Sequence, residues 1–257
     1  MPARKKTAKA ATKRATPAAR TRDTASDVAY ALGWLEKRGT KKNRDGMARY
    51  GIVAKKVFGV SMGTMKSLAK ELGRDHALSQ ALWKTGWYEA RMLASLVGEP
   101  DRVTPAQMER WAKAFDNWAV CDGVCCHLLI YTPFAWPTIP RWSRRQGEFV
   151  RRGAFSMLAG LAAHDRTADD GRFIEALPLI ESAADDGRNF VKKAVNWALR
   201  SIGKRSPMLN KEAVAVARRL ADADDSASRW VGKDALRELT SPAVQRRLAK
   251  PRAKKVA

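Results

Sequence analysis

The sequence has few cysteines, no long apolar run and few acidic residues. Its three cysteines, Cys121, Cys125 and Cys126, lie within six positions of one another. Cysteines this close on one helix do not form a disulfide framework, so a reducing, cytoplasmic setting is expected. No stretch of about 18 apolar residues occurs, so no membrane partner is expected. The basic N-terminus is not followed by an apolar segment, so a secretory signal is not expected.

Several motifs of known chemistry are missing as well. The sequence has no Walker motif, no dinucleotide-binding glycine pattern and no serine nucleophile elbow. The cysteines and His127 lack the spacing of zinc ligands, and no second cluster follows, so we expect no metal and no cofactor. We expect the thiols to be small buried side chains. His76 and His164 have no evident partner and are expected at the surface or at helix ends.

Acidic residues are outnumbered by basic ones. The chain has 49 Lys and Arg against 26 Asp and Glu, a formal net charge of +23. Residues 1–22 carry eight basic side chains and residues 246–257 carry six, with no acidic residue in either segment. Residues 23–245 therefore keep a net charge of +9, which favours a polyanion such as nucleic acid as the partner. The alternative is a basic surface that serves only solubility.

The chain is predicted to be all-α. Residues 1–22 lack the apolar surface that folding requires, and we expect them to form a disordered basic N-terminal segment. From Asp23 onward, apolar residues recur at helical spacing and strand-like alternation is scarce. Gly and Pro clusters divide this region into roughly a dozen short helices. We expect one elongated domain over residues 23–245, followed by a basic tail at 246–257.

An internal repeat supports that reading. The segment at 149–154 (FVRRGA) has an echo 41 residues later at 190–195 (FVKKAV), and a weaker copy follows at 230–235 (WVGKDA). An earlier relative is 87–92 (WYEARM). A period of about 40 residues with two helices per unit is typical of HEAT-like repeats. Such units stack into a superhelical solenoid with a concave groove, here expected to be basic.

The helix expected from Phe190 to about Lys204 has two distinct faces. At 100° per residue, its apolar residues form one stripe that suits the core. Lys193, Trp197, Arg200 and Lys204 fall together on another side. A tryptophan among cations suits contact with a sugar or base beside a phosphate track, whereas most tryptophans belong to the core.

Arg152 occupies the repeat position that Lys193 occupies in the next copy. Ser156, Ala159 and Ala163 lie on the same side of its helix, and their small size is expected to leave room for a ligand. Equivalent cations on successive repeats indicate a row of phosphate contacts. A solvated arginine is the alternative.

Trp118 and Asp122, four residues apart, share one face of a further helix. A carboxylate beside a tryptophan would repel DNA phosphates, so mere coating of DNA gives it no purpose. It could form an ordinary salt bridge with Arg91 or Arg152, or act as a catalytic carboxylate. Both can hold in the resting protein.

Four segments in order resemble the AlkD-like DNA alkylation repair proteins: 49–52 (RYGI), 59–62 (GVSM), 81–94 (ALWKTGWYEARMLA) and 189–204 (NFVKKAVNWALRSIGK). The resemblance covers about residues 24–245. It implies a HEAT-like superhelix that cradles duplex DNA as a monomer and hydrolyses the N-glycosidic bond of purines alkylated at N3 or N7, without base flipping. Its active-site pattern falls on Trp118, Asp122, Arg152 and Trp197.

The resemblance also sets expectations for DNA binding and for the site's surroundings. We expect the DNA backbone to be bound by Arg152, Lys193, Arg200, Lys204 and Arg91. Many relatives have an acidic residue after the first tryptophan, where this chain has Ala119. Two alternatives remain open: a DNA-binding protein without catalysis, and a helical-repeat scaffold for a protein partner. On either DNA-binding interpretation, association with the nucleoid is expected.

Overall fold

The computed structural model describes residues 23–250, and within them every regular element is helical. The elements are α1 (Thr24–Glu36), α2 (Lys41–Arg49), α3 (Met62–Leu72), α4 (His76–Lys84), α5 (Tyr88–Val97), η1 (Pro100–Arg102), α6 (Pro105–Lys113), α7 (Trp118–His127), η2 (Leu129–Tyr131), α8 (Ala135–Ser143), α9 (Glu148–His164), α10 (Asp170–Glu181), α11 (Asn189–Gly203), α12 (Pro207–Ala221), α13 (Ser226–Leu239) and α14 (Pro242–Ala249). The all-α prediction is confirmed. None of these helices has the length and apolar character required to cross a membrane.

The two predicted tails are only partly covered. The basic N-terminal segment expected to be disordered, residues 1–22, lies outside the described residues. Helix α14 continues to Ala249, so the tail expected from residue 246 begins inside this helix.

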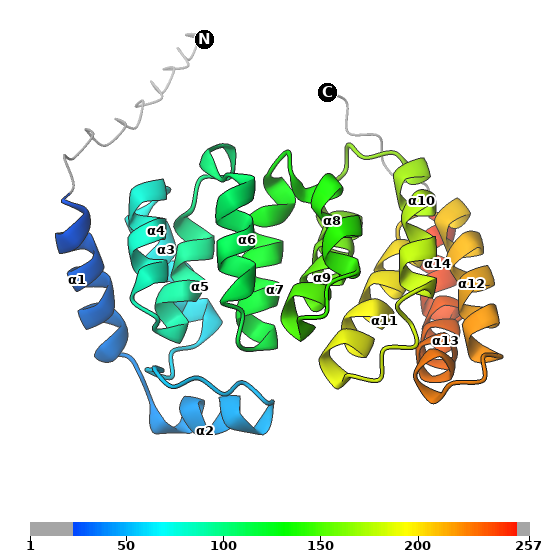
Figure 1. Ribbon diagram of the computed structural model, residues 1–257, viewed down its shortest axis with the longest axis horizontal. Helices are drawn as coiled ribbons and strands as arrows, with labels where there is room; N and C mark the ends of the chain where they lie inside the picture. The colour runs from blue at the N-terminus through cyan, green and yellow to red at the C-terminus, as the bar shows by residue number, and fades with distance from the viewer. Residues whose placement is uncertain (1–22, 251–257) are drawn as a thin grey trace, which may run out of the picture.

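The helices stack side by side in chain order along the long axis of the molecule (Figure 1). Helices α5, α7, α9, α11 and α13 form one row in which each contacts the next, and α4, α8, α10 and α12 pack against members of this row. The three copies of the sequence repeat lie near the starts of α9, α11 and α13. The predicted stack of helix pairs is therefore present.

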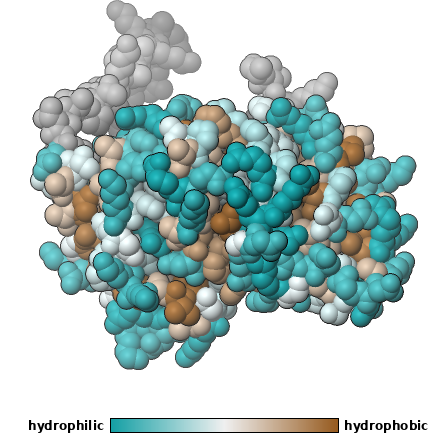
Figure 2. Space-filling view, viewed as in Figure 1, coloured by the Kyte–Doolittle hydropathy of each residue, from teal (hydrophilic) through white to brown (hydrophobic). Residues whose placement is uncertain are grey.

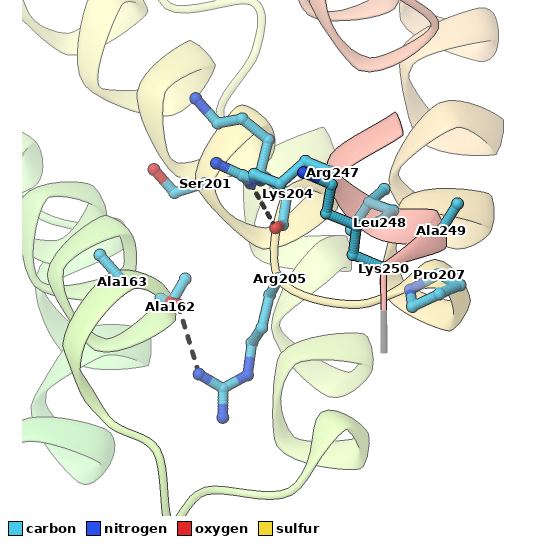
Figure 3. A pocket seen from close by; sticks show the side chains of 10 residues that line it. All are labelled: Ala162, Ala163, Ser201, Lys204, Arg205, Pro207, Arg247, Leu248, Ala249 and Lys250. Carbon is cyan, nitrogen blue, oxygen red and sulfur yellow. Dashed lines mark hydrogen bonds between the residues drawn. The ribbon is translucent and has the colours of Figure 1, made fainter. Parts of the chain in front are cut away.

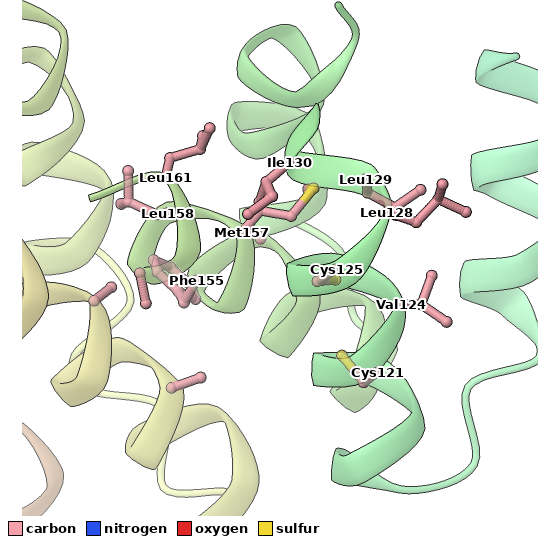
Figure 4. Close-up of a cluster of buried hydrophobic side chains, with 14 of the residues drawn as sticks. Cys121, Val124, Cys125, Leu128, Leu129, Ile130, Phe155, Met157, Leu158 and Leu161 are labelled. Atoms are coloured by element: carbon pink, nitrogen blue, oxygen red, sulfur yellow. The ribbon is translucent and has the colours of Figure 1, made fainter. Parts of the chain in front are cut away.

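One continuous apolar core runs through the stack. The predicted apolar stripe of α11 is buried from Val191 to Ile202, whereas Phe190 at its start is only half-buried. Figure 4 shows buried side chains of α7 and α9 pointing into the spaces between neighbouring helices. Helices α12 and α13 approach so closely that a Cβ on Gly232 would lie 2.2 Å from the Ala221 nitrogen, so only glycine fits there.

The face of the molecule seen in Figure 2 is mostly polar. Figure 2 shows hydrophilic side chains over most of one face, with apolar ones scattered among them. His76 was expected at the surface or at a helix end. It is the first residue of α4, but it is buried, and this burial lowers its pKa. His164 is exposed at the end of α9.

Residues 40–59, here called the arm, leave the stack and return to it. The two ends of the arm meet where the Thr40 N–H donates to the Gly59 carbonyl at 3.1 Å. The returning segment is held by Glu89, which is fully buried and accepts the N–H groups of Phe58, Gly59 and Val60. Helix α2 lies within the arm, has no buried residue, and runs below the row of helices in Figure 1. The arm is therefore fixed at its base and exposed along its length.

Candidate functional site

Helix α7 presents Trp118 and Asp122. The helix begins after Asn117, whose side chain accepts the Val120 N–H at 3.0 Å and so fixes the first turn. Cys121 between the two residues is buried, which turns Trp118 and Asp122 away from the core. The Asp122 carboxylate keeps 17% of its surface exposed. A partly desolvated carboxylate thus stands one helical turn from a tryptophan.

Arg152 of α9 holds this carboxylate with both ends of its guanidinium. Its Nε donates to Oδ1 of Asp122 at 2.9 Å, and its Nη2 donates to Oδ2 at 2.6 Å. The Arg152 side chain is only 8% exposed. Burial lowers the pKa of Arg152, but the charge and hydrogen bonds of Asp122 outweigh this and leave the pKa raised. The geometry is that of a bidentate arginine–carboxylate ion pair.

Ser156, one turn further along α9, donates an additional hydrogen bond to the Asp122 carboxylate. Its hydroxyl donates to Oδ1 of Asp122 at 2.6 Å, and the residue is fully buried. The prediction that Ser156 and Ala159 leave room for a ligand is wrong, because both are fully buried; Ala163 on the same side is exposed. The small size of Ser156 instead lets α7 approach α9 closely enough for this hydrogen bond.

Arg152 also reaches the third helix of the site. Its Nη1 donates to the Phe190 carbonyl in the first turn of α11 at 2.5 Å. Three of the five N–H groups of an arginine are thus engaged, one on each nitrogen, and one remains on each of Nη1 and Nη2. The same side chain therefore positions Asp122, connects α7, α9 and α11, and keeps two donors for a ligand.

The arm closes over this site. The Trp118 indole N–H donates to the Tyr50 carbonyl at 2.9 Å. The next residue, Gly51, has a positive φ of 71°, and a Cβ there would lie 3.3 Å from Cζ of Phe190. The Arg152 guanidinium carbon lies 5.8 Å from the Trp118 ring centroid. Tyr50 and Gly51 were not predicted as site residues, although both lie in one of the segments that carried the resemblance.

A cleft of about 490 Å³ lies between the arm and the starts of α7 and α11. It is lined by Arg49, Tyr50, Gly51, Trp118, Arg152, Asn189, Phe190 and Lys193. Three of these side chains are aromatic and three are cationic, so the cleft combines surfaces for ring stacking with charges for phosphate. The structure thus brings the predicted residues Trp118, Arg152 and Lys193 to one opening.

The other predicted residues of α11 lie further along the helix. Trp197 is half-buried, one turn beyond Lys193. Arg200 and Lys204 donate to the two carboxylate oxygens of Glu238 on α13, at 2.5 and 2.6 Å. Burial raises the pKa of Glu238, but the Lys204 hydrogen bond and the two cations reverse this and leave the pKa lowered. Both cations thus have a local partner.

Arg91 is also engaged away from Asp122. Its Nη1 lies 2.9 Å from Oδ2 of Asp116, at the turn before α7. Of the two partners considered for Asp122, the structure selects Arg152.

The cysteines serve the α7–α9 contact. Their Sγ atoms point at successive carbonyls of α9: Cys121 at Phe149 (3.2 Å), Cys125 at Gly153 (3.6 Å) and Cys126 at Ser156 (3.7 Å). Burial raises the pKa of Cys125 and Cys126, so both stay protonated thiols. Within residues 23–250, no group of three or more His, Cys, Asp or Glu is placed to hold a metal ion.

Comparison with known proteins places this geometry in context. The family model for DNA alkylation repair enzymes matches residues 32–239. A solved structure described as "a new family of proteins related to the HEAT-like repeat DNA glycosylases with affinity for branched DNA structures" shares the fold, with a TM-score of 0.71. It is 20% identical, and the match covers 88% of this chain and 97% of that chain. Among curated proteins, no significant match was found. The chain belongs to the DNA alkylation repair enzyme family.

Proposed function

We propose that this protein is a DNA glycosylase that hydrolyses the N-glycosidic bond of purines carrying a positive charge from alkylation at N3 or N7. The observation that carries the proposal is the Asp122 carboxylate, fixed by Arg152 and Ser156 one helical turn from Trp118, with Arg152 and Trp118 both lining a cationic, aromatic cleft. Membership in a family of DNA alkylation repair enzymes supports it.

The proposed reaction suits a site with one carboxylate and no evident acid. An alkylated purine of this kind is already cationic, so it leaves without prior protonation. The bond between C1′ and the purine nitrogen breaks, its electron pair goes to the purine, and a neutral alkylpurine departs. Water adds to C1′ and loses a proton, which leaves an abasic site. The transition state requires stabilisation of the positive charge that develops on the sugar, and a fixed carboxylate provides this stabilisation.

Within this scheme, each oxygen of Asp122 has a distinct task. Oδ1 accepts two hydrogen bonds, from Arg152 and Ser156, whereas Oδ2 accepts one from Arg152. Oδ2 therefore retains a lone pair that can face the sugar and orient the attacking water. Trp118 and Trp197 would pack against the sugar and backbone, with cation–π attraction to the developing charge.

The DNA partner is assigned from charge. Residues 23–245 carry a net charge of +9, and Arg49 and Lys193 flank the free donors of Arg152 at the cleft. We propose that a monomer binds duplex DNA along a concave basic groove in the nucleoid. Arg91, Arg200 and Lys204 would contribute longer-range attraction, because each already has a carboxylate partner. From the family resemblance, we further propose that the base stays stacked during cleavage.

The test is release of 7-methylguanine from duplex DNA by the native protein and by Asp122→Asn. We expect the variant to be at least about 100-fold slower, equivalent to about 3 kcal/mol of barrier. Asp101→Asn, an exposed carboxylate in η1, is the matched control and should retain the native rate. Equal rates for native protein and Asp122→Asn would contradict the assignment, as would excision of uracil, a neutral base that needs an acid.

A DNA-binding protein without catalysis is the second candidate. It is favoured by the similarity in fold to a protein whose described property is affinity for branched DNA. Tight, salt-sensitive binding without release of 7-methylguanine or 3-methyladenine would select it, and a comparison of four-way junctions with duplex would then follow. A scaffold for a protein partner would instead show no steep dependence of DNA binding on salt.

A further inference from the structure

A second cavity lies at the opposite ends of the site helices. It has a volume of about 700 Å³ and opens between the last turns of α9 and α11, the start of α12 and helix α14 (Figure 3). Its lining includes the small residues Ala163 and Ser201 and four cations, Lys204, Arg205, Arg247 and Lys250, and no acidic residue lines it within the described range. Nothing in the glycosylase mechanism uses this cavity.

The cavity lies on the same side of α11 as the candidate site. Lys204, the C-cap of α11, follows Lys193 by eleven residues. Eleven residues make three helical turns, so the two lysines lie on one side of the helix, about 16 Å apart. The residues between them on this side, Trp197 and Arg200, are partly exposed, so a ligand lying along α11 from the site would reach the cavity.

The four cations differ in how far they are already neutralised. Arg205 is buried, donates to the Asp165 and Ala168 carbonyls at 2.6 Å and pairs with Asp170, so it forms the wall. Lys204 is paired with Glu238. Arg247 donates one Nη2 hydrogen to the Lys204 carbonyl at 2.6 Å but is otherwise exposed, and Lys250 is exposed. Two positive charges thus remain for an anion.

We propose that this cavity binds a backbone phosphate of the DNA that occupies the candidate site, through Arg247 and Lys250. The proposal rests on the proposed function for the identity of the ligand. A separation of about 16 Å corresponds to roughly five base pairs at 3.4 Å per step. The small side chains admit the backbone, and the cations match its charge. Helix α14 therefore provides a second contact with the DNA backbone, about half a turn of duplex from the target base.

The experiment measures binding of undamaged 20-base-pair duplex to Arg247→Ala, Lys250→Ala and the control Arg246→Ala across a salt series. Arg246 is exposed on the same helix but does not line the cavity. Each phosphate contact contributes about 0.9 to the slope of log affinity against log salt, so its loss weakens binding about fivefold at 0.15 M salt. We expect this loss for Arg247→Ala and Lys250→Ala and less than a twofold change for Arg246→Ala.

Three outcomes decide the matter. A slope of log affinity against log salt that is lowered only in the two cavity variants supports phosphate binding in the cavity. This result does not depend on whether the native protein releases bases, so it is distinguishable from failure of the glycosylase proposal. An equal loss in all three variants would overturn phosphate binding in the cavity, because it would reveal diffuse attraction. An unchanged slope in Lys250→Ala would overturn it too. Within residues 23–250 the exposed Lys250 side chain forms no hydrogen bond or ion pair, so its loss should leave the fold intact, and thermal melting checks that both variants remain folded.

Discussion

The Arg152–Asp122 pair allows a quantitative test of how the site is built. Two unit charges about 4 Å apart attract by about 4 kcal/mol at an effective dielectric constant near 20. Both side chains are mostly buried, at 8% and 17% exposure, so desolvation offsets part of that attraction. Arg152→Ala leaves the carboxylate with only Ser156 as a partner. We expect each single alanine variant to lower the free energy of unfolding by about 3 kcal/mol.

The double variant separates the pair from its surroundings. If the two side chains stabilise mainly each other, Arg152→Ala/Asp122→Ala should lose about 2 kcal/mol less than the sum of the single losses. The assay is urea denaturation of the native protein, both single variants and the double variant. The more exposed Arg91–Asp116 pair is the control, with an expected coupling of about 0.5 kcal/mol. A coupling at Arg152–Asp122 no larger than this would refute the reasoning.

Three further predictions concern the arm, a histidine and the thiols. Gly46→Ala, within α2 and with open space around its Cβ position, should raise stability by about 0.5–1 kcal/mol, whereas Gly51→Ala, at positive φ and against Phe190, should lower it by about 1 kcal/mol, both read from thermal melting. Burial and the charge of Lys66 lower the pKa of His127 below 6.5 in the folded protein, so the unfolded chain takes up the proton first. The urea concentration at the unfolding midpoint should therefore decrease as the pH is lowered from 7 to 5, and His127→Gln should reduce this dependence on pH. Cys125, which is fully buried and whose pKa is raised by that burial, should resist iodoacetamide at pH 8 in the folded protein and react after unfolding; rapid labelling of Cys125 in the native protein would contradict its burial.

Helical periodicity was sufficient to predict much of this fold. The apolar stripe of α11 lies in the core and the repeat marks one row of helices, because burial of one helical face is a local property of the sequence. The same angular argument placed Asp122 and Lys193 off the core, and the structure leaves both at least partly exposed, whereas Trp118 and Trp197, also expected off the core, are half-buried and pack against its edge. Their roles in catalysis and DNA binding stay predictions.

Contacts between distant segments could not be read in this way. Glu238 lies on α13, and nothing in the pattern of α11 indicates that it neutralises Arg200 and Lys204. Ser156 was seen only as a small residue, because its hydrogen bond depends on how closely α7 approaches α9. The arm was missed for the same reason: the positive φ of Gly51 and the carbonyl of Tyr50 matter only once α7 and α11 lie beside them.

The arm has a consequence for cooperativity. In a plain stack of helical repeats, each unit contacts only its neighbours, so the stability of the array is close to a sum of nearest-neighbour terms. Here a segment that leaves the first helices reaches Trp118 and Phe190, well beyond the adjacent pair. Local opening of the N-terminal end would therefore free the indole of Trp118 while α7 itself stays folded. Substitutions in α1 or α3, far from any chemistry, would then change the fraction of molecules with an assembled site and leave the site's geometry in the remaining molecules intact.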